Sequence, residues 1–101
     1  MESHGGHTFC LIENISQKPY GMEIWTLGYV KDIHLSEDHI ILQYNGCEIK
    51  VVTSMLDPIA YQKGTLFTCL AHLEKDKSLL AKVLRNSDGM NPDIFIKCVS
   101  M

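Results

Sequence analysis

An Asn-Gly pair at residues 45–46 constrains the fold of this chain more than any other feature of its sequence. The pair lies between two segments, residues 39–44 and 47–53, in which apolar and polar side chains alternate. Asn and Gly readily adopt the positive φ angles that both central positions of a two-residue hairpin turn require. The sequence therefore predicts two antiparallel strands joined at this turn.

The two-residue turn also fixes which residues face each other across the hairpin. Tyr44 is placed opposite Cys47, and each step away from the turn pairs the next two residues. In this register, apolar side chains share one face of the hairpin and polar side chains share the other. The apolar face comprises Ile40, Leu42, Ile49 and Val51, and the polar face comprises Gln43, Glu48 and Lys50. We expect the apolar face in the core and the polar face in solvent.

The longest predicted strand covers residues 22–35, which are rich in β-branched and aromatic side chains. Gly28 lies in the middle of this segment. A glycine inside a strand often marks a bulge or a sharp bend. A long strand with a central bend can pair with two different sets of strands, which is how small barrels turn a corner.

Two further strands are predicted at residues 65–73 and 78–85, on either side of a charged turn. Residues 55–63 interrupt the strand pattern. Within them, Asp57 can cap a helix and Pro58 suits a first helical position, so we predict one or two helical turns there.

The two ends of the chain have different characters. Residues 1–7 are rich in Gly and His, and we expect a flexible N-terminus there. Residues 8–101 then form a single domain that begins with a short apolar segment. Asn91-Pro92-Asp93 combines a capping residue, a proline and an acid near the positive end of the helix dipole. This pattern predicts a C-terminal helix at about residues 91–101.

These elements predict an all-β domain with a C-terminal helix. Five strands, with a helical turn between the third and fourth, are typical of the OB fold, a five-stranded antiparallel barrel. An SH3-like barrel and a half-sandwich are the alternatives. The long first strand with its central glycine and the helical connection favour the OB fold.

Composition and the motifs present weigh against several classes of function. The chain has 101 residues and a net charge of −3, whereas unaided binding to a nucleic-acid backbone requires an excess of Lys and Arg. No apolar run is long enough to span a bilayer, and the first residues do not resemble a secretion signal. No catalytic or phosphate-binding motif is present, so we predict neither enzymatic activity nor a cofactor.

The four cysteines do not have the spacing of a metal site. None of them forms a C-x-x-C pair, which a zinc site normally contains. Each lies close to apolar residues, and we predict four reduced, mostly buried thiols and no metal site. They are Cys10, Cys47, Cys69 and Cys98.

Four segments in order resemble one known family. They are Ile24-Trp25-Thr26-Leu27-Gly28, Lys63-Gly64-Thr65-Leu66, Ala81-Lys82-Val83-Leu84 and Asp88-Gly89-Met90-Asn91, followed by an apolar helix. The pattern covers roughly residues 22–96 and is similar to the Ten-one family, the smallest subunit of the CST (Ctc–Stn–Ten) telomere complex. The smallest subunit of replication protein A is architecturally close and remains an alternative.

This resemblance implies a non-catalytic subunit that heterodimerises with a Stn-type OB-fold protein. Through that partner it would join the large CST subunit, support single-stranded DNA binding and chromosome-end protection, and assist lagging-strand fill-in by polymerase α–primase. The implied location is the nucleus, at telomeres. An autonomous OB module that binds single-stranded nucleic acid directly is a further alternative, but such a module would be expected to be basic.

The C-terminal helix carries the predicted partner interface. Its apolar residues form two neighbouring stripes, one containing Ile94 and Cys98 and the other Phe95 and Val99. A surface helix needs to bury only one stripe, so the second favours a partner protein. Met90, in the Gly-Met-Asn segment, is added as an adaptable apolar contact. Burial of both stripes in the protein's own core is the alternative.

Nucleic-acid contacts are predicted at scattered aromatic and basic residues. Exposed aromatic rings can stack on bases, and basic side chains can bind phosphates. We expect only one or two such phosphate contacts, made within a complex. The alternative for the tryptophan is packing against the N-terminal apolar segment. The candidates are Trp25, Tyr29, Lys31, Lys50 and Arg85.

Overall fold

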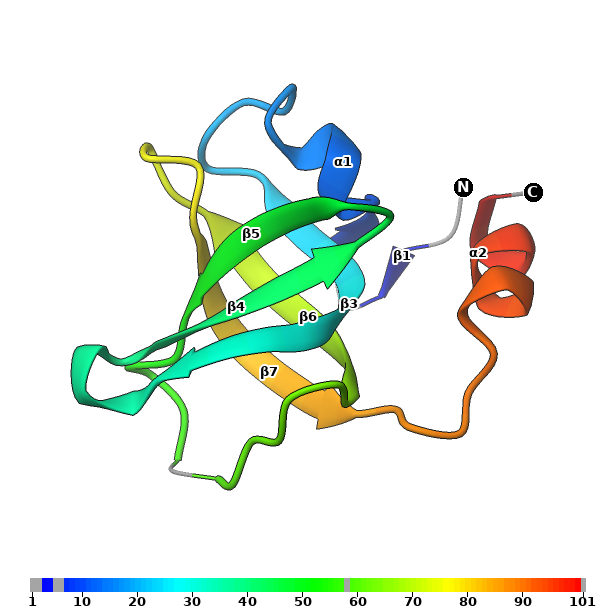
Figure 1. The fold of residues 1–101 in the computed structure, drawn as a ribbon. Coiled ribbons are helices and arrows are strands. Elements are labelled where there is room, and N and C mark those ends of the chain that lie inside the picture. Colours follow the sequence, from blue (N-terminus) through cyan, green and yellow to red (C-terminus); the bar gives the residue numbers. More distant parts are fainter. Residues whose placement is uncertain (1–2, 5–6, 58, 101) are drawn as a thin grey trace.

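Five strands of the chain close into a barrel (Figure 1). The computed structural model describes residues 3–4, 7–57 and 59–100. In the chain order of the barrel strands, β3 spans Glu23–His34, β4 His39–Tyr44, β5 Cys47–Val52, β6 Leu66–Leu73 and β7 Leu79–Asn86. The other elements are β1 (Ser3–His4), β2 (His7–Phe9), the helix α1 (Ile12–Ile15), the 3-10 helix η1 (Leu35–Glu37) and the helix α2 (Pro92–Ser100).

The strands follow the order β3-β4-β5-β7-β6, and β6 pairs with β3 to close the ring. The prediction of an all-β domain with a C-terminal helix is confirmed. One detail is corrected, because β5 and β7 run parallel and pair Val51 with Leu79. Strand direction must alternate in a wholly antiparallel ring. A closed ring with an odd number of strands therefore contains at least one parallel pair.

The hairpin at Asn45-Gly46 has the predicted register. Both turn residues have positive φ, 53° for Asn45 and 78° for Gly46. Tyr44 pairs with Cys47, and the pairing continues without a shift to the far end of the hairpin. The four apolar residues assigned to the inner face are all buried: Ile40, Leu42, Ile49 and Val51.

The long strand β3 changes partner along its length. From Glu23 to Tyr29 it pairs with β6, and from Tyr29 to His34 it pairs with β4. This confirms that one strand serves two sets of neighbours. Of the two alternatives predicted at Gly28, a bulge or a bend, the bulge is not found there, because the register shift lies between Val30 and Asp32. Gly28 is needed for close packing instead, since a Cβ there would lie 2.8 Å from Cδ1 of Ile12.

Strand pairing extends into the N-terminal segment. Strand β2 pairs in parallel with the start of β3, and β1 pairs with β2. The physical reason is that the first half of β3 has β6 on one edge only, so its other edge accepts β2. Residues 1–2 and 5–6, part of the predicted flexible end, lie outside the described residues. Ile12 and Ile15 of α1 pack into the interior cluster of the barrel.

The connection between β5 and β6 is irregular. Residues 53–57 and 59–65 form turns without a helix, which corrects the predicted helical turns, and Pro58 lies outside the described residues. Hydrogen bonds across short turns hold this segment, such as that from the Leu56 amide to the Thr53 carbonyl at 3.0 Å. Leu56 and Tyr61 both pack against the interior cluster. This packing and the short-turn hydrogen bonds hold the connection in place without a helix.

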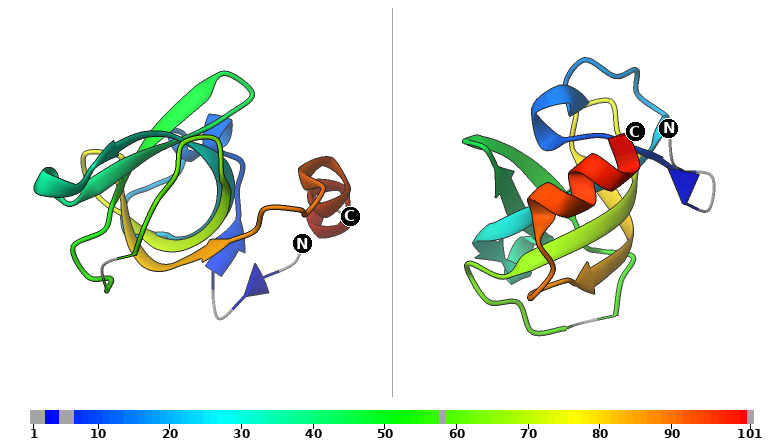
Figure 2. Two further views of the ribbon diagram at one scale, coloured as in Figure 1. Left: turned by 60° about the horizontal axis from the view of Figure 1, so that its bottom comes forward. Right: turned by 90° about the vertical axis from the view of Figure 1, so that its right-hand side faces the viewer.

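The apolar side chains form two separate clusters. One fills the barrel, and the other lies outside it, where Phe9, Leu27 and Leu66 meet Val99 of α2. Figure 2 shows α2 lying against the outside of the barrel.

The four cysteines are free thiols. Cys10 and Cys69 are buried and Cys47 is half-buried, whereas Cys98 is exposed. No helix within the described residues is long and apolar enough to cross a membrane.

Candidate functional site

The start of α2 is fixed by side-chain capping. The Asn91 carboxamide oxygen accepts hydrogen bonds from the amides of Asp93, at 3.0 Å, and Ile94, at 3.3 Å. The preceding loop is anchored to the barrel because an Asp88 carboxylate oxygen accepts a hydrogen bond from the Leu66 amide at 2.8 Å. The two Asn91 contacts satisfy amides that a helix N-terminus otherwise leaves unpaired. Together with the Asp88 contact to β6, they fix where α2 begins beside the barrel.

One face of α2 packs on the barrel. Val99 is 5% exposed, and the half-buried Phe95 and Ile96 belong to the same outer cluster. The rings of Phe95, Trp25 and Phe9 meet edge to face, with centroid separations of 5.3–5.7 Å. Such aromatic contacts stabilise by about 0.5–1.5 kcal/mol beyond area burial. The Phe95–Val99 stripe therefore docks α2 onto its own barrel.

The neighbouring face of α2 is left open. Ile94 is 60% exposed, and Cys98 on the next turn is also exposed. The structure thus separates the two predicted stripes, because Phe95 and Val99 face the barrel while Ile94 and Cys98 face solvent. The possibility that both stripes are buried in the protein's own core does not match this arrangement.

A groove runs beside α2 along the outer surface of β6 and β7. It encloses a cavity of about 270 Å³, and Met90 and Phe95 line it from the α2 side. Leu70 and Val83 form an apolar floor, and Val83 is 40% exposed. The remaining lining residues are Trp25, Thr68, Arg85 and Ser87. The groove and the open face of α2 together form what we call the α2 surface, defined by Ile94, Cys98 and the groove residues.

Sequence reasoning missed the floor of this groove. In β6, Leu70 alternates with buried residues, so its side chain points outward on the same face as those of Thr68 and His72. An apolar side chain at an outward position was therefore the available signal. The alternation of side chains was a weaker guide to Val83 on β7, because the pairing of β6 with β7 shifts in register between Leu70 and Ala71.

The predicted nucleic-acid residues do not converge on one surface. Trp25 and Arg85 line the groove. Tyr29 stacks on Tyr44, with ring centroids 6.3 Å apart. Lys31 forms an ion pair with Glu48 that raises the pKa of the lysine, and Lys50 is exposed on β5. The basic candidates are therefore dispersed over several strands.

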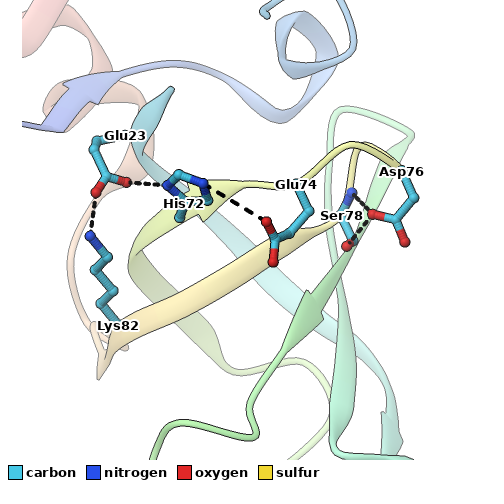
Figure 3. Close-up of polar contacts among 6 residues, drawn as sticks. All are labelled: Glu23, His72, Glu74, Asp76, Ser78 and Lys82. Atoms are coloured by element: carbon cyan, nitrogen blue, oxygen red, sulfur yellow. Dashed lines mark hydrogen bonds and ion pairs between the residues drawn. The ribbon is translucent and has the colours of Figure 1, made fainter. Parts of the chain in front are cut away.

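A polar cluster joins β3, β6 and β7 near the groove (Figure 3). The Glu23 carboxylate pairs with Lys82 and lies 3.2 Å from Nδ1 of His72. The hydrogen bond from Lys82 is the main cause that holds the pKa of Glu23 below its usual range, with a smaller contribution from His72. On the far side, Nε2 of His72 lies 3.8 Å from Glu74. These contacts tie together the three strands that carry the groove.

The fold of this chain is similar to those of several proteins of known structure. Telomere capping protein Ten1 from S. pombe is similar over 93% of this chain and 94% of its own, with a TM-score of 0.83 and 17% identity. A chain of the S. pombe Stn1–Ten1 complex is similar over 97% and 92%, with a TM-score of 0.85 and 17% identity. The hypothetical protein ygiW from E. coli is similar over 82% and 99%, with a TM-score of 0.58 and 11% identity.

Sequence comparisons identify the family of this chain. A search of curated proteins finds no match. A model of the family described as "Telomere-capping, CST complex subunit", however, matches residues 3–101. The solved structures, at 17% identity or less, support the fold alone. Because the family model covers nearly the whole chain, this protein belongs to the telomere-capping family of CST complex subunits.

Proposed function

We propose that this chain is a non-catalytic OB-fold subunit that pairs with a Stn-type OB-fold protein through the α2 surface. The observation that supports this most is the exposure of Ile94 beside an apolar groove, while the neighbouring Phe95–Val99 stripe of α2 is already packed on the barrel. The similarity to a chain of the S. pombe Stn1–Ten1 complex supports a partner of this type.

The α2 surface has the chemistry of a protein interface. The groove is lined by the large apolar and aromatic residues Met90, Phe95 and Trp25, and also by Arg85. Aromatic, methionine and arginine side chains are enriched at such interfaces. A standard interface buries about 800 Å² on each partner, which requires the open face of α2 as well as the groove.

The proposed pair acts within a larger assembly. Through the Stn-type subunit, the chain would join the large CST subunit at telomeres in the nucleus and support single-stranded DNA binding and end protection. The same assembly would assist lagging-strand fill-in by polymerase α–primase. The dispersed lysines of this chain support a structural role, in which it contributes at most one or two phosphate contacts.

Exchange of one exposed residue tests the interface. Ile94→Glu places a charge in the proposed contact and should weaken binding to a Stn-type partner by about 2 kcal/mol or more, a loss of at least about thirtyfold. Binding would be measured by calorimetry or by recovery of the co-expressed pair. The barrel should stay folded by circular dichroism, because Ile94 is 60% exposed.

Met55→Glu is the matched control. Met55 is also exposed, at 65%, but lies on the connection between β5 and β6. This variant should bind the partner as the parent chain does. Equal binding by the Ile94→Glu variant and the parent would contradict the proposed surface.

A further inference from the structure

A separate cluster of metal-ligating side chains lies at the β3–β4 turn, on the side of the barrel away from α2 (Figure 1). His34 is the last residue of β3 and His39 the first of β4, and the two pair directly across the strands. Glu37 lies between them in η1. The antiparallel register therefore brings together two imidazoles and a carboxylate from a short stretch of chain.

The potential ligand atoms of these three residues are close together. One atom from each side chain lies within 4.8 Å of the others. The two imidazole rings stack with centroids 4.7 Å apart, and Nδ1 of His34 lies 3.8 Å from a Glu37 carboxylate oxygen. The side chains of His34 and Glu37 are 44% and 68% exposed, so they have room to adjust.

The backbone that carries the cluster is held in place. Asp38 adopts a left-handed conformation with φ of 54°, and its amide donates to the Leu35 carbonyl at 3.1 Å. The Asp38 carbonyl accepts a hydrogen bond from the Thr53 amide at 2.7 Å, which ties the turn to the end of β5. A fixed turn of this kind lowers the conformational cost of bringing three ligands to one ion.

We propose that His34, Glu37 and His39 bind one divalent transition-metal ion of the Zn²⁺ type. Two imidazole nitrogens and one carboxylate oxygen, with water in a fourth position, suit Zn²⁺. Mg²⁺ and Ca²⁺ prefer ligand sets made of oxygen. Zinc bonds of about 2.0–2.2 Å place tetrahedral ligands about 3.4 Å apart, so the side chains would move by roughly 1 Å.

The prediction of no metal site was based on the spacing of the cysteines, and the proposed site contains none of them. It depends on a cross-strand histidine pair, which the five-residue separation of His34 and His39 in the sequence does not reveal. The ion would hold the ends of β3 and β4 together, and it would stabilise the folded chain because the folded turn brings the three ligands closer together than the unfolded chain does.

The polar cluster in Figure 3 provides a matched control. It contains one histidine and two carboxylates, and Glu23 contacts Nδ1 of His72 whereas Glu74 contacts Nε2. The two nitrogens of one ring point in different directions, so these carboxylates cannot share one ion with His72. Replacement of His72 therefore removes a histidine without removing the proposed site.

The test is calorimetric titration of the full chain with ZnCl₂. We expect one ion per chain and a rise in Tm of about 5 °C at saturating zinc, with no response to MgCl₂. His34→Gln and His39→Gln should each weaken zinc binding by about tenfold or more. His72→Gln and His4→Gln should retain it. Circular dichroism would establish that each variant is folded.

Two results would overturn the site. One is an absence of zinc binding by the parent chain, and the other is binding that persists in both His34→Gln and His39→Gln. Backbone NMR provides a second measurement, because zinc should shift the amide signals of residues 34–39 before others. The outcome does not depend on binding to a Stn-type partner, since the Ile94→Glu experiment tests a surface on the other side of the barrel.

Discussion

At the scale of single residues, the polar side chain of Thr26 is poorly matched to its buried surroundings. Its side chain is fully buried in β3, opposite Cys69 of β6, and its hydroxyl has no hydrogen-bond partner among the described residues. A buried hydroxyl without a partner costs about 1–3 kcal/mol relative to hydration. The interior packing of the barrel must offset this cost, and an apolar side chain of the same shape would avoid it.

Thr26→Val should therefore stabilise the chain by about 1 kcal/mol, because valine keeps the shape and removes the unpaired hydroxyl. Urea unfolding monitored by circular dichroism would measure this as a higher midpoint with an unchanged slope. Thr68→Val is the control, since the Thr68 hydroxyl lies 3.2 Å from that of Ser87 and its loss should destabilise. Destabilisation of both variants alike would mean that Thr26 is hydrogen-bonded in solution.

At the scale of elements, the close approach between α1 and β3 positions the N-terminal segment. Gly28 permits this approach, because it faces Cδ1 of Ile12 and the Gln43 carbonyl oxygen of β4. A Cβ at Gly28 would lie 3.1 Å from that backbone oxygen. The absence of a side chain at one position of β3 thus allows both α1 and β4 to pack against it.

Gly28→Ala should destabilise the chain by about 1–3 kcal/mol, which is the usual cost of overpacking a filled core. Shortening Ile12 should return part of that loss, so the Ile12→Val/Gly28→Ala double variant should be less destabilised than the sum of the two single variants. Thermal or urea unfolding of the four proteins gives this coupling. Strict additivity would show that Ile12 does not restrict the site.

At the scale of the whole molecule, the distribution of charge separates a structural subunit from an independent nucleic-acid binder. The net charge is −3, and the basic residues of the barrel strands are spread over three of them, with Lys31 on β3, Lys50 on β5, and Lys82 and Arg85 on β7. Of these, Lys31 pairs with Glu48 and Lys82 with Glu23. Neutralisation of phosphates is the main source of affinity for single strands, and paired, dispersed cations supply little of it.

We therefore expect the isolated chain to bind single-stranded DNA weakly. Fluorescence anisotropy with a labelled oligonucleotide should give no saturable binding at low micromolar protein and physiological salt, in contrast to the pair with a Stn-type subunit. Tight binding by the isolated chain that falls steeply with salt would favour an autonomous single-strand-binding module. Lys50→Glu would then identify whether β5 carries the contact.

Local signals in the sequence were sufficient for most elements of this protein. The Asn45-Gly46 turn determined its hairpin, because positive φ and a two-residue loop leave one register available. Asn91 and Pro92 marked the start of α2, since capping depends on adjacent residues only. The resemblance to the telomere family was also contained in short segments of sequence.

Tertiary structure alone decided the pairing of distant segments. The parallel contact of β5 with β7 follows from closure of an odd-numbered ring, and β2 orders because β3 has a free edge. Which stripe of α2 docks depends on where Phe9 and Trp25 are placed by other strands. The same holds for the groove and for the His34–His39 pair, since strand register, not sequence spacing, brings those side chains together.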